Sequence, residues 1–516
     1  MTRKQKFFVL CVCLFLFRCA FLFVGFDRLP MLPTLGDEVI LNDPAVSLAQ
    51  TGHFVCSSFP HSPLQLDQWF GHHPPVFFLM QAVIFRLFGL SALTLRIVGM
   101  LSAAMVPVLC VSIILELCER KLVDFTTVLL LAPVLFFDAT TITYGRWARM
   151  ESLADVFVLL ALWLLLCGPK HTAEWRSRCL AGTCMGLAFG THFAVILIFP
   201  FFVLLLFVDT SRKTREAIAP ILLSALVPIL LWVSVHGRNS LLAWKQMTAI
   251  VKYIPGPIIS SLRPFSGAST HLLNLQQVNQ LGGTIVILFL ASAIAIACKA
   301  LNVVLKNGAS GLWRDEAGRK VSVCASCTLG ALISVLFLIP WNATRMILLF
   351  PLIVITLAIG LSPLGPVTAR LRTVVLIALF LFQAGSLTIY FQRLPAQWHE
   401  RDSARYSPLI ASIAVQKTAV VPPELWFAFR SVKHPVAVLY PYMGELRPWL
   451  NSPEYMDGYD VVILKGGMDH EAELTSIAQR QHTLTREWNT KRDVFHVFIR
   501  PDSTTDPVVH TLRSSR

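Results

Sequence analysis

Long apolar runs separated by short polar segments occupy most of the first 391 positions of the chain. Each run supplies most of the roughly 20 helical residues that cross the hydrocarbon core of a bilayer. The pattern therefore predicts a polytopic α-helical membrane protein with about eleven spans. The expected spans lie near residues 7–25, 97–117, 122–140, 152–168, 179–191, 193–208, 217–235, 282–298, 321–340, 343–361 and 373–391.

One apolar stretch, Pro74 to Phe88, is too short to cross comfortably and contains Arg86. We expect a juxtamembrane helix here, with the paired prolines at its start, where missing N–H groups cost least. With this assignment the basic inter-span loops fall on one side, which the positive-inside rule makes cytoplasmic. These loops hold Arg120 and Lys121, Lys170 to Arg178, Arg212 to Arg215, Lys299 to Lys320, and Arg370 and Arg372.

The first span follows Arg3, Lys4 and Lys6 and lacks a small-residue cleavage site, which predicts a retained signal anchor with a cytoplasmic N-terminus. The loop over 26–74 is then outside. The run over 179–208 is interrupted by His192 and Pro200, and we interpret it as two short passes. If residues 179–208 formed a single broken helix instead, the sidedness of every later segment would be reversed.

After residue 391 the pattern changes to short β-branched and aromatic runs between turn signals. The runs are "PVAVLY", "DVVILK" and "DVFHVFIR", with a helix-like "HEAELTSIAQRQ" between the last two. We therefore expect a transmembrane catalytic domain over 1–392 and a soluble α/β domain over 393–516. An odd number of spans places the second domain on the outer face.

Composition agrees with a membrane protein, because 55% of the residues are hydrophobic and only 14% are charged. The net charge of +14 belongs largely to short loops, so it gives no reason to expect nucleic acid as a partner. Most of the 12 cysteines sit in apolar runs, where a thiol behaves as a small hydrophobe. Cys324 and Cys327 have no partner pair that would suggest zinc.

Candidate chemistry begins in the first outer loop, where Asp37 and Glu38 follow Gly36 close behind a span. A solvated loop also carries carboxylates. Against that reading, carboxylates at a membrane surface disfavour anionic headgroups unless they have a role there.

The second candidate is "GRWARMESL", with Arg146, Arg149 and Glu151 between two spans on the same side. Two arginines three apart on one helical face would suit a phosphate or pyrophosphate, and interfacial anchoring is the alternative. Arg345, which opens a later span, allows the same two readings.

Together these segments resemble the GT-C class of membrane glycosyltransferases. The resemblance rests on Gly-Asp-Glu after the first span, "HHPP", "RLFGLSALTLRIVG", "GRWARMESL" and "TRMILLFPLIVITLAIGL". It is nearest to the aminoarabinose and protein-mannose transferases and to the lipopolysaccharide sugar transferases of rhizobia. It implies a GT-C fold, a polyprenyl-phosphate sugar donor and an active site on the periplasmic or luminal side of the inner or plasma membrane.

Carried over by position, the family's acidic motif falls on Asp37 and Glu38, and its second acidic site falls on Glu151. In the "HHPP" segment, His72 and His73 stand at the substrate-binding position. A lysine is common at the place of His73 in the aminoarabinose transferases, and an imidazole is charged only part of the time near neutral pH. The family's late arginine matches Arg345.

The chemistry of such a transfer explains the acidic pair. A hydroxyl of a lipid, glycan or protein acceptor needs a general base, which Asp37 or Glu38 would supply. The departing lipid phosphate needs fixed cations, which Arg149 and Arg345 would supply. No cofactor is certain. Asp37, Glu38 and Glu151 also suit a divalent cation, and carboxylates alone do not distinguish a metal site from a base.

Two other classes fit part of the pattern. A transporter would also have many spans with charges, but it usually shows repeated halves and polar residues at midplane. Here the polar residues gather at one membrane face, with Asp155 and His192 as exceptions. An envelope-assembly protein could bind through the α/β domain, but it would not require acidic and arginine clusters on several outer loops.

Overall fold

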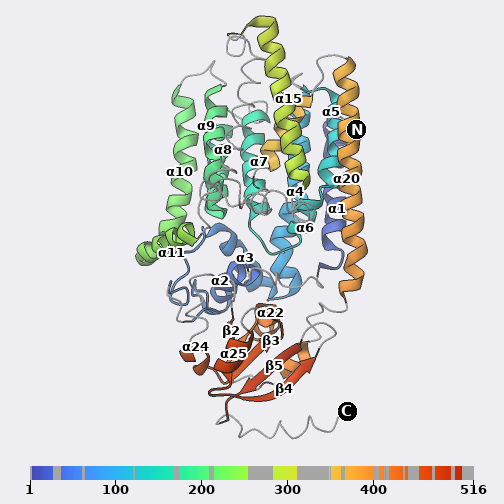
Figure 1. Ribbon diagram of the computed structural model, residues 1–516. Coiled ribbons are helices and arrows are strands. Elements are labelled where there is room, and N and C mark those ends of the chain that lie inside the picture. Colours follow the sequence, from blue (N-terminus) through green and yellow to red (C-terminus); the bar gives the residue numbers. More distant parts are fainter. Residues whose placement is uncertain are drawn as a thin grey trace, which may run out of the picture.

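A computed structural model gives the architecture of the chain, which has a long helical part, a layer of short helices and a terminal sheet (Figure 1). The structure describes residues 3–26, 37–60, 64–119, 123–167, 174–208, 214–253, 283–308, 310, 348, 350–361, 366–398, 406–411, 413, 418–433, 436–439, 453–467, 471–489 and 494–501.

A bundle of helices forms the upper part of the molecule in Figure 1. They are α1 (Arg3–Phe23), α4 (Ala92–Glu119), α5 (Phe125–Phe136), α7 (Glu151–Cys167), α8 (Glu174–Thr191), α9 (Phe199–Val208), α10 (Thr214–His236), α15 (Gly283–Asn307), α19 (Phe350–Leu361) and α20 (Pro366–Trp398). Helices therefore occupy the expected spans wherever the structure describes them. The expected span 321–340 lies outside the described residues.

Length and composition suit a membrane crossing in three helical stretches of the described chain: Ala92–Glu119, Ile218–Thr248 and Arg372–Gln392. The outer helices expose large apolar side chains, including Leu222 and Leu230 of α10 and Leu381 of α20. A helix that is apolar on its exposed side as well as on its packed side is typical of contact with lipid. The composition of these helices and their exposed apolar side chains therefore both indicate contact with lipid.

The direction of the chain through 174–236 follows from where α8 and α10 end. His192, just after α8, lies 6.5 Å from His73 between ring centroids, and His236, at the end of α10, accepts a hydrogen bond from Trp69. Both helices therefore end against the same loop. The chain must return between them, through the 3₁₀ helix η3 (Phe193–Leu197) and α9, as the two-pass prediction requires.

Buried polar groups join α1 and α20 to the connection after α5. Gln383 of α20 donates to the Asp138 carboxylate at 3.0 Å and accepts from the backbone N–H of Ala139 at 2.9 Å. Arg18 of α1 donates to the Phe136 carbonyl and to the Thr141 hydroxyl. Because unsatisfied polar groups are costly in a membrane, this junction fixes how the three segments pack.

Short helices form a layer below this bundle: α2 (Asp37–Thr51), α3 (Val76–Phe88), η4 (Gly237–Asn239) and α11 (Ser240–Tyr253). Helix α6 (Ala139–Gly145) lies within the bundle and contacts α1, α4 and α20. The expected juxtamembrane helix over 74–88 is confirmed as α3. The hydropathy pattern did not locate α2, which lies within the segment expected as a loop. Its mixed sequence, "DEVILNDPAVSLAQT", has no clear apolar stripe.

The terminal part is a five-stranded sheet with the order β2-β1-β3-β5-β4. Its elements are α21 (Ser407–Ala411), β1 (Ala419–Val421), α22 (Pro423–Ser431), β2 (Val436–Val438), α24 (Pro453–Asp457), β3 (Val461–Lys465), α25 (Glu471–Ala478), β4 (Thr483–Asn489) and β5 (Val494–Ile499). Strand β1 pairs in parallel with β2 and β3, whereas β5 is antiparallel to β3 and β4. The three expected strands and the expected helix are confirmed, and β1 and β4 are additional.

The α/β part packs directly on the layer of short helices (Figure 1). One hydrophobic core runs through both, from Val39 and Phe77 to Trp426 and Val462. The segment between the first two predicted spans and the described residues after α20 therefore lie on the same face of the helical part, as predicted.

Candidate active site

The Glu38 carboxylate is fully buried and holds three separate parts of the chain together. It accepts from Arg96 of α4 through Nε at 3.2 Å and through Nη2 at 3.1 Å. It also accepts from the backbone N–H of Ala148 at 2.9 Å. A carboxylate engaged by a planar two-pronged donor and a backbone N–H is fixed in place. This junction sets the start of α2 against the segment over 146–150.

Asn42, one turn further along α2, strengthens the same junction. Its amide donates to the Glu38 carbonyl at 2.7 Å and to the Ala148 carbonyl at 3.3 Å. Its oxygen accepts from Gln81 of α3 at 3.3 Å. Asp37 is the first residue of α2, so its backbone belongs to this fixed corner. The side chain of Asp37 and all of Arg345 lie outside the described residues.

The two arginines of "GRWAR" do not share a helical face, so that prediction is wrong. Helix α6 ends at Gly145, and α7 begins only at Glu151. Arg146 is fully buried and points to α1 and α20: it donates to the Tyr390 hydroxyl at 3.0 Å and to the Val24 carbonyl. Its guanidinium carbon lies 5.5 Å from the centre of the Tyr390 ring. These contacts make Arg146 an anchor between helices.

Arg149 instead faces the start of α7, where it pairs with Glu151. Its Nη2 lies 2.6 Å from Glu151 Oε1, and its Nε donates to both carboxylate oxygens at 3.1 and 3.2 Å. Both side chains are almost fully buried. Because it is hydrogen-bonded to Arg149, the Glu151 carboxylate fixes the orientation of the Arg149 guanidinium. Tyr144 lies near both charged groups, and burial is the main cause that raises the pKa of its phenol to about 12.

Two histidines, His192 and His73, lie near the Arg149–Glu151 pair. His192, between α8 and η3, interacts electrostatically with Glu151. His73 lies 6.5 Å from His192 and stacks at 6.1 Å on Phe193, measured between ring centroids. His73 of the "HHPP" segment thus neighbours His192, and His192 in turn interacts with Glu151 of the Arg149–Glu151 pair. His72 neighbours His73 at 5.0 Å, and burial lowers the pKa of His72 to about 4, so its imidazole is neutral.

Asp155, one turn along α7 from Glu151, is buried with both carboxylate oxygens unpaired among the described residues. Within the same residues, no group of three or more His, Cys, Asp or Glu side chains has the arrangement of a metal site. The cation hypothesis named Asp37, Glu38 and Glu151. Of these, Glu38 is engaged by Arg96 and Glu151 by Arg149, and the side chain of Asp37 lies outside the described residues.

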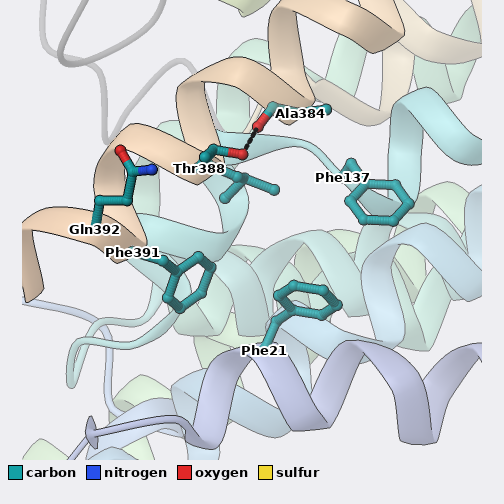
Figure 2. Close-up of a pocket in the computed structure, with 7 residues that line it drawn as sticks. Phe21, Phe137, Ala384, Thr388, Phe391 and Gln392 are labelled. Atoms are coloured by element: carbon teal, nitrogen blue, oxygen red, sulfur yellow. Dashed lines mark hydrogen bonds between the residues drawn. The ribbon is translucent and has the colours of Figure 1, made fainter.

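An apolar groove runs along the outside of the helices next to Arg146. Its walls come from Phe21, Phe137, Ala384, Leu387, Thr388, Phe391 and Gln392. Figure 2 shows the rings of Phe21, Phe137 and Phe391 turned toward one another beside α20. Phe391 also lies 5.7 Å from the Arg146 guanidinium. The groove offers a surface for a hydrocarbon chain at the edge of the candidate site.

Comparison with known proteins gives a family match over part of the chain and a fold match over nearly all of it. Residues 72–236 match the family model of the dolichyl-phosphate-mannose-protein mannosyltransferases. That stretch includes His72, His73, Arg146, Arg149 and Glu151. A search of curated protein sequences finds no match to the chain.

Solved structures match over nearly the whole chain. ArnT from Cupriavidus metallidurans bound to undecaprenyl phosphate has a TM-score of 0.58 at 11% identity, covering 96% of this chain and 98% of that one. Its apo state has a TM-score of 0.55 at 13% identity with the same coverage. This chain has the GT-C fold. The oligosaccharyltransferase of Archaeoglobus fulgidus tethered with an acceptor peptide also matches, with a TM-score of 0.51 at 11% identity, 96% of this chain and 74% of that one.

The resemblance found in the sequence is thus confirmed at the level of the GT-C fold. At 11–13% identity the shared fold does not assign chemistry, which has to be argued from side chains. The sequence analysis assigned no role to two residues of the candidate site. Arg96 was quoted only as part of "RLFGLSALTLRIVG", and Tyr144 was not singled out. His192 was noted only as a polar exception in a span.

Proposed function

We propose that the chain is a membrane glycosyltransferase that moves a sugar from a polyprenyl phosphate to a hydroxyl acceptor on the extracytoplasmic face. The observation that carries the proposal is the Glu38 junction. It ties the acidic start of α2 to the segment that continues into Arg149 and Glu151. A base and a phosphate-binding cation are the two groups that such a transfer requires.

In the proposed mechanism Asp37 is the general base, because Glu38 is already engaged by Arg96 and Ala148. Asp37 takes the proton from the acceptor hydroxyl as its oxygen attacks the anomeric carbon. The bond from that carbon to the phosphate oxygen breaks, and the lipid phosphate leaves with the electron pair. Glu38 acts by positioning the start of α2.

Arg149 binds the departing phosphate, and Glu151 holds the guanidinium in the required orientation. Arg345 is proposed as the second cation by family likeness. His73 lies beside His192, next to the Arg149–Glu151 pair, and would bind the phosphate or the sugar. The lipid tail stays in the membrane, so only the headgroup has to be positioned. ArnT bound to undecaprenyl phosphate, which shares the fold, supports a donor of this class.

The test is transfer of radiolabelled sugar from a panel of polyprenyl-phosphate sugars in membranes, with and without chelator. We expect transfer by the wild type and a loss of about a hundredfold or more for Asp37→Asn. Glu473→Gln, at an exposed position of α25, is the matched control and should keep wild-type transfer. Absence of transfer from every donor, or full activity of Asp37→Asn, would refute the proposal. Sensitivity to the chelator would show that a cation takes part.

A further inference from the structure

Helix α22 of the α/β part contacts α2, the helix that begins at the proposed general base Asp37, through a buried ion pair. Arg430 Nη2 lies 3.1 Å from Asp43 Oδ1 in α2. The same nitrogen donates to the hydroxyls of Ser47 at 3.3 Å and of Ser57 at 3.1 Å. The Asp43 side chain is fully buried, and that of Arg430 is 12% exposed.

Two uncharged hydrogen bonds support the same contact. The indole N–H of Trp426 donates to the Ser58 hydroxyl at 2.7 Å, and the backbone N–H of Val438 donates to the Ser58 carbonyl at 3.0 Å. Asp43 in turn accepts from the backbone N–H of Ser58 at 2.8 Å. Helix α22 and strand β2 therefore both hold the segment that follows α2.

Stability alone is a weak reason for a buried ion pair, because desolvation offsets much of the attraction and an apolar contact often serves as well. What such a pair provides is a defined geometry. We infer that the C-terminal α/β domain is a positioning element of the active site, in which Arg430 holds α2 through Asp43. The inference rests on the proposed function, in which the general base is the first residue of that helix.

The physical link from Arg430 to the site is short. Asp43 is adjacent to Asn42, whose amide contacts the carbonyls of Glu38 and Ala148. Asp43 is six positions after Asp37 in the helix, which is a rise of about 9 Å. Without Arg430, α2 keeps its contacts with Gln81 and Ser58 but loses its charged contact with helix α22, so we expect its position to become less defined. Misplacing a catalytic group by about 1 Å can cost a hundredfold in rate.

Cys56 gives a direct reporter of this contact. Its side chain is fully buried at the interface and lies within reach of Asp43 and Arg430. Burial, together with the neighbouring Asp43 carboxylate, raises the pKa of the Cys56 thiol well above its usual value. A buried and protonated thiol reacts slowly, and an opened interface would expose it to reagent.

The experiment compares Arg430→Met and Arg430→Lys with the wild type in the full-length protein. Lys465→Met is the matched control, because it breaks the 3.1 Å pair with Glu424 inside the α/β domain without reaching α2. Three quantities are measured: sugar-transfer kinetics, hydrogen exchange, and maleimide labelling of Cys56 located by mass spectrometry. Hydrogen exchange compares residues 37–51 with strands β1 and β3.

For Arg430→Met we expect kcat to fall by about tenfold or more with a smaller change in the donor KM, because the proposed phosphate ligands lie elsewhere. Exchange should rise in α2 while β1 and β3 stay protected, and Cys56 should become reactive. Arg430→Lys should be intermediate, because one ammonium cannot reproduce the planar guanidinium. Lys465→Met should match the wild type in transfer and in Cys56 labelling.

Transfer within twofold of wild type by Arg430→Met, while Cys56 is exposed, would overturn the inference. Lost transfer with unchanged exchange in α2 would overturn it as well. Loss of protection in β1 and β3 would mean that the domain had unfolded, and Arg430→Lys then decides. If the wild type transfers no sugar, the proposed function fails by itself, and exchange and labelling still show whether Arg430 fixes α2.

Discussion

At the scale of single residues, the candidate site is governed by how each charge is paired. Glu38 and Glu151 are both buried carboxylates, but one holds Arg96 and a backbone N–H, whereas the other holds Arg149. Removing one partner of a buried pair leaves an uncompensated charge, which costs more than the pair itself contributes. Substitutions at these positions therefore separate positioning from catalysis.

Glu38→Gln should lower stability more than Asp37→Asn does. The substitution leaves the buried Arg96 guanidinium without its anionic partner, a loss of about 3 kcal/mol or more. Thermal unfolding in detergent measures it, and Glu38→Gln combined with Arg96→Met should recover part of the loss. Equal stability of Glu38→Gln and wild type would contradict the role assigned to the junction.

Arg149→Lys should lower transfer even though the residue stays cationic. Lysine lacks the two-pronged donor that the Glu151 carboxylate orients, so both the donor KM and kcat should worsen. A simple interfacial anchor would tolerate lysine, because snorkelling needs only a stem and a charge. Donor-titrated kinetics decide between these roles, and wild-type values would remove Arg149 from the phosphate site.

His72 should make stability depend on pH in the acid range. Burial lowers its pKa from 6.5 to about 4, so the unfolded chain takes up a proton that the folded protein excludes. The stability contributed by the neutral imidazole is therefore complete above pH 6.5 and is lost as the pH falls toward 4. His72→Gln should flatten this fall in melting temperature between pH 6.5 and 4. An unchanged pH profile would show that His72 does not contribute to it.

At the scale of elements, α11 holds the turn that leads to the histidines. Gln246 is fully buried, accepts from the backbone N–H of Gly71 at 2.6 Å and donates to the carbonyls of Leu64 and Trp69 at 2.7 and 2.8 Å. This amide satisfies a segment with no regular secondary structure, as buried backbone groups require. The position of His72 and His73 thus depends on a helix about 170 residues away.

Gly71→Ala should disturb this contact. An added Cβ would lie 2.1 Å from the Cβ of Ala243, so α11 would have to move. We expect a destabilisation of about 1–3 kcal/mol and lower transfer, because the overpacking lies next to His72. Gly385→Ala in α20 is the control, since nothing lies within 4 Å of its added Cβ. Equal melting temperatures for both variants would contradict the close approach of α11.

At the scale of the whole molecule, the layer of short helices and the α/β part pack on each other at one face of the helical part and share a core (Figure 1). A shared core across segments nearly 400 residues apart makes independent motion of the domain unfavourable. Helices α2 and α3 and the α/β part should therefore have the same sidedness in the membrane.

Cysteines placed at Gln65 and at Arg480, both exposed, should be labelled from outside by a membrane-impermeant reagent. The distribution of basic residues between the predicted spans motivates this sidedness. A cysteine at Lys306, at the end of α15, should react only after permeabilisation. Labelling of Gln65 and Arg480 only in permeabilised membranes would reverse the proposed orientation.

The sequence by itself determined the class of protein and most of its helices. Hydropathy over a window of about 20 residues is a local property, and a bilayer allows few alternatives to a helix for such a window. Strands β2, β3 and β5 were also identifiable, because runs of β-branched and aromatic residues are a local signal. Helix α2 was not, because its burial comes from two layers packed on either side and leaves no periodic stripe.

Only the tertiary structure decided which charges meet. Glu38 and Arg96 are 58 positions apart, and Arg430 reaches α2 from the far end of the chain. Neither pair could be read from spacing, because an ion pair depends on distance in space. The helical face assumed for Arg146 and Arg149 failed for a related reason. Helix α6 ends at Gly145. Beyond it, Arg146 bonds to Tyr390 and Arg149 bonds to Glu151, so the two arginines contact different neighbours.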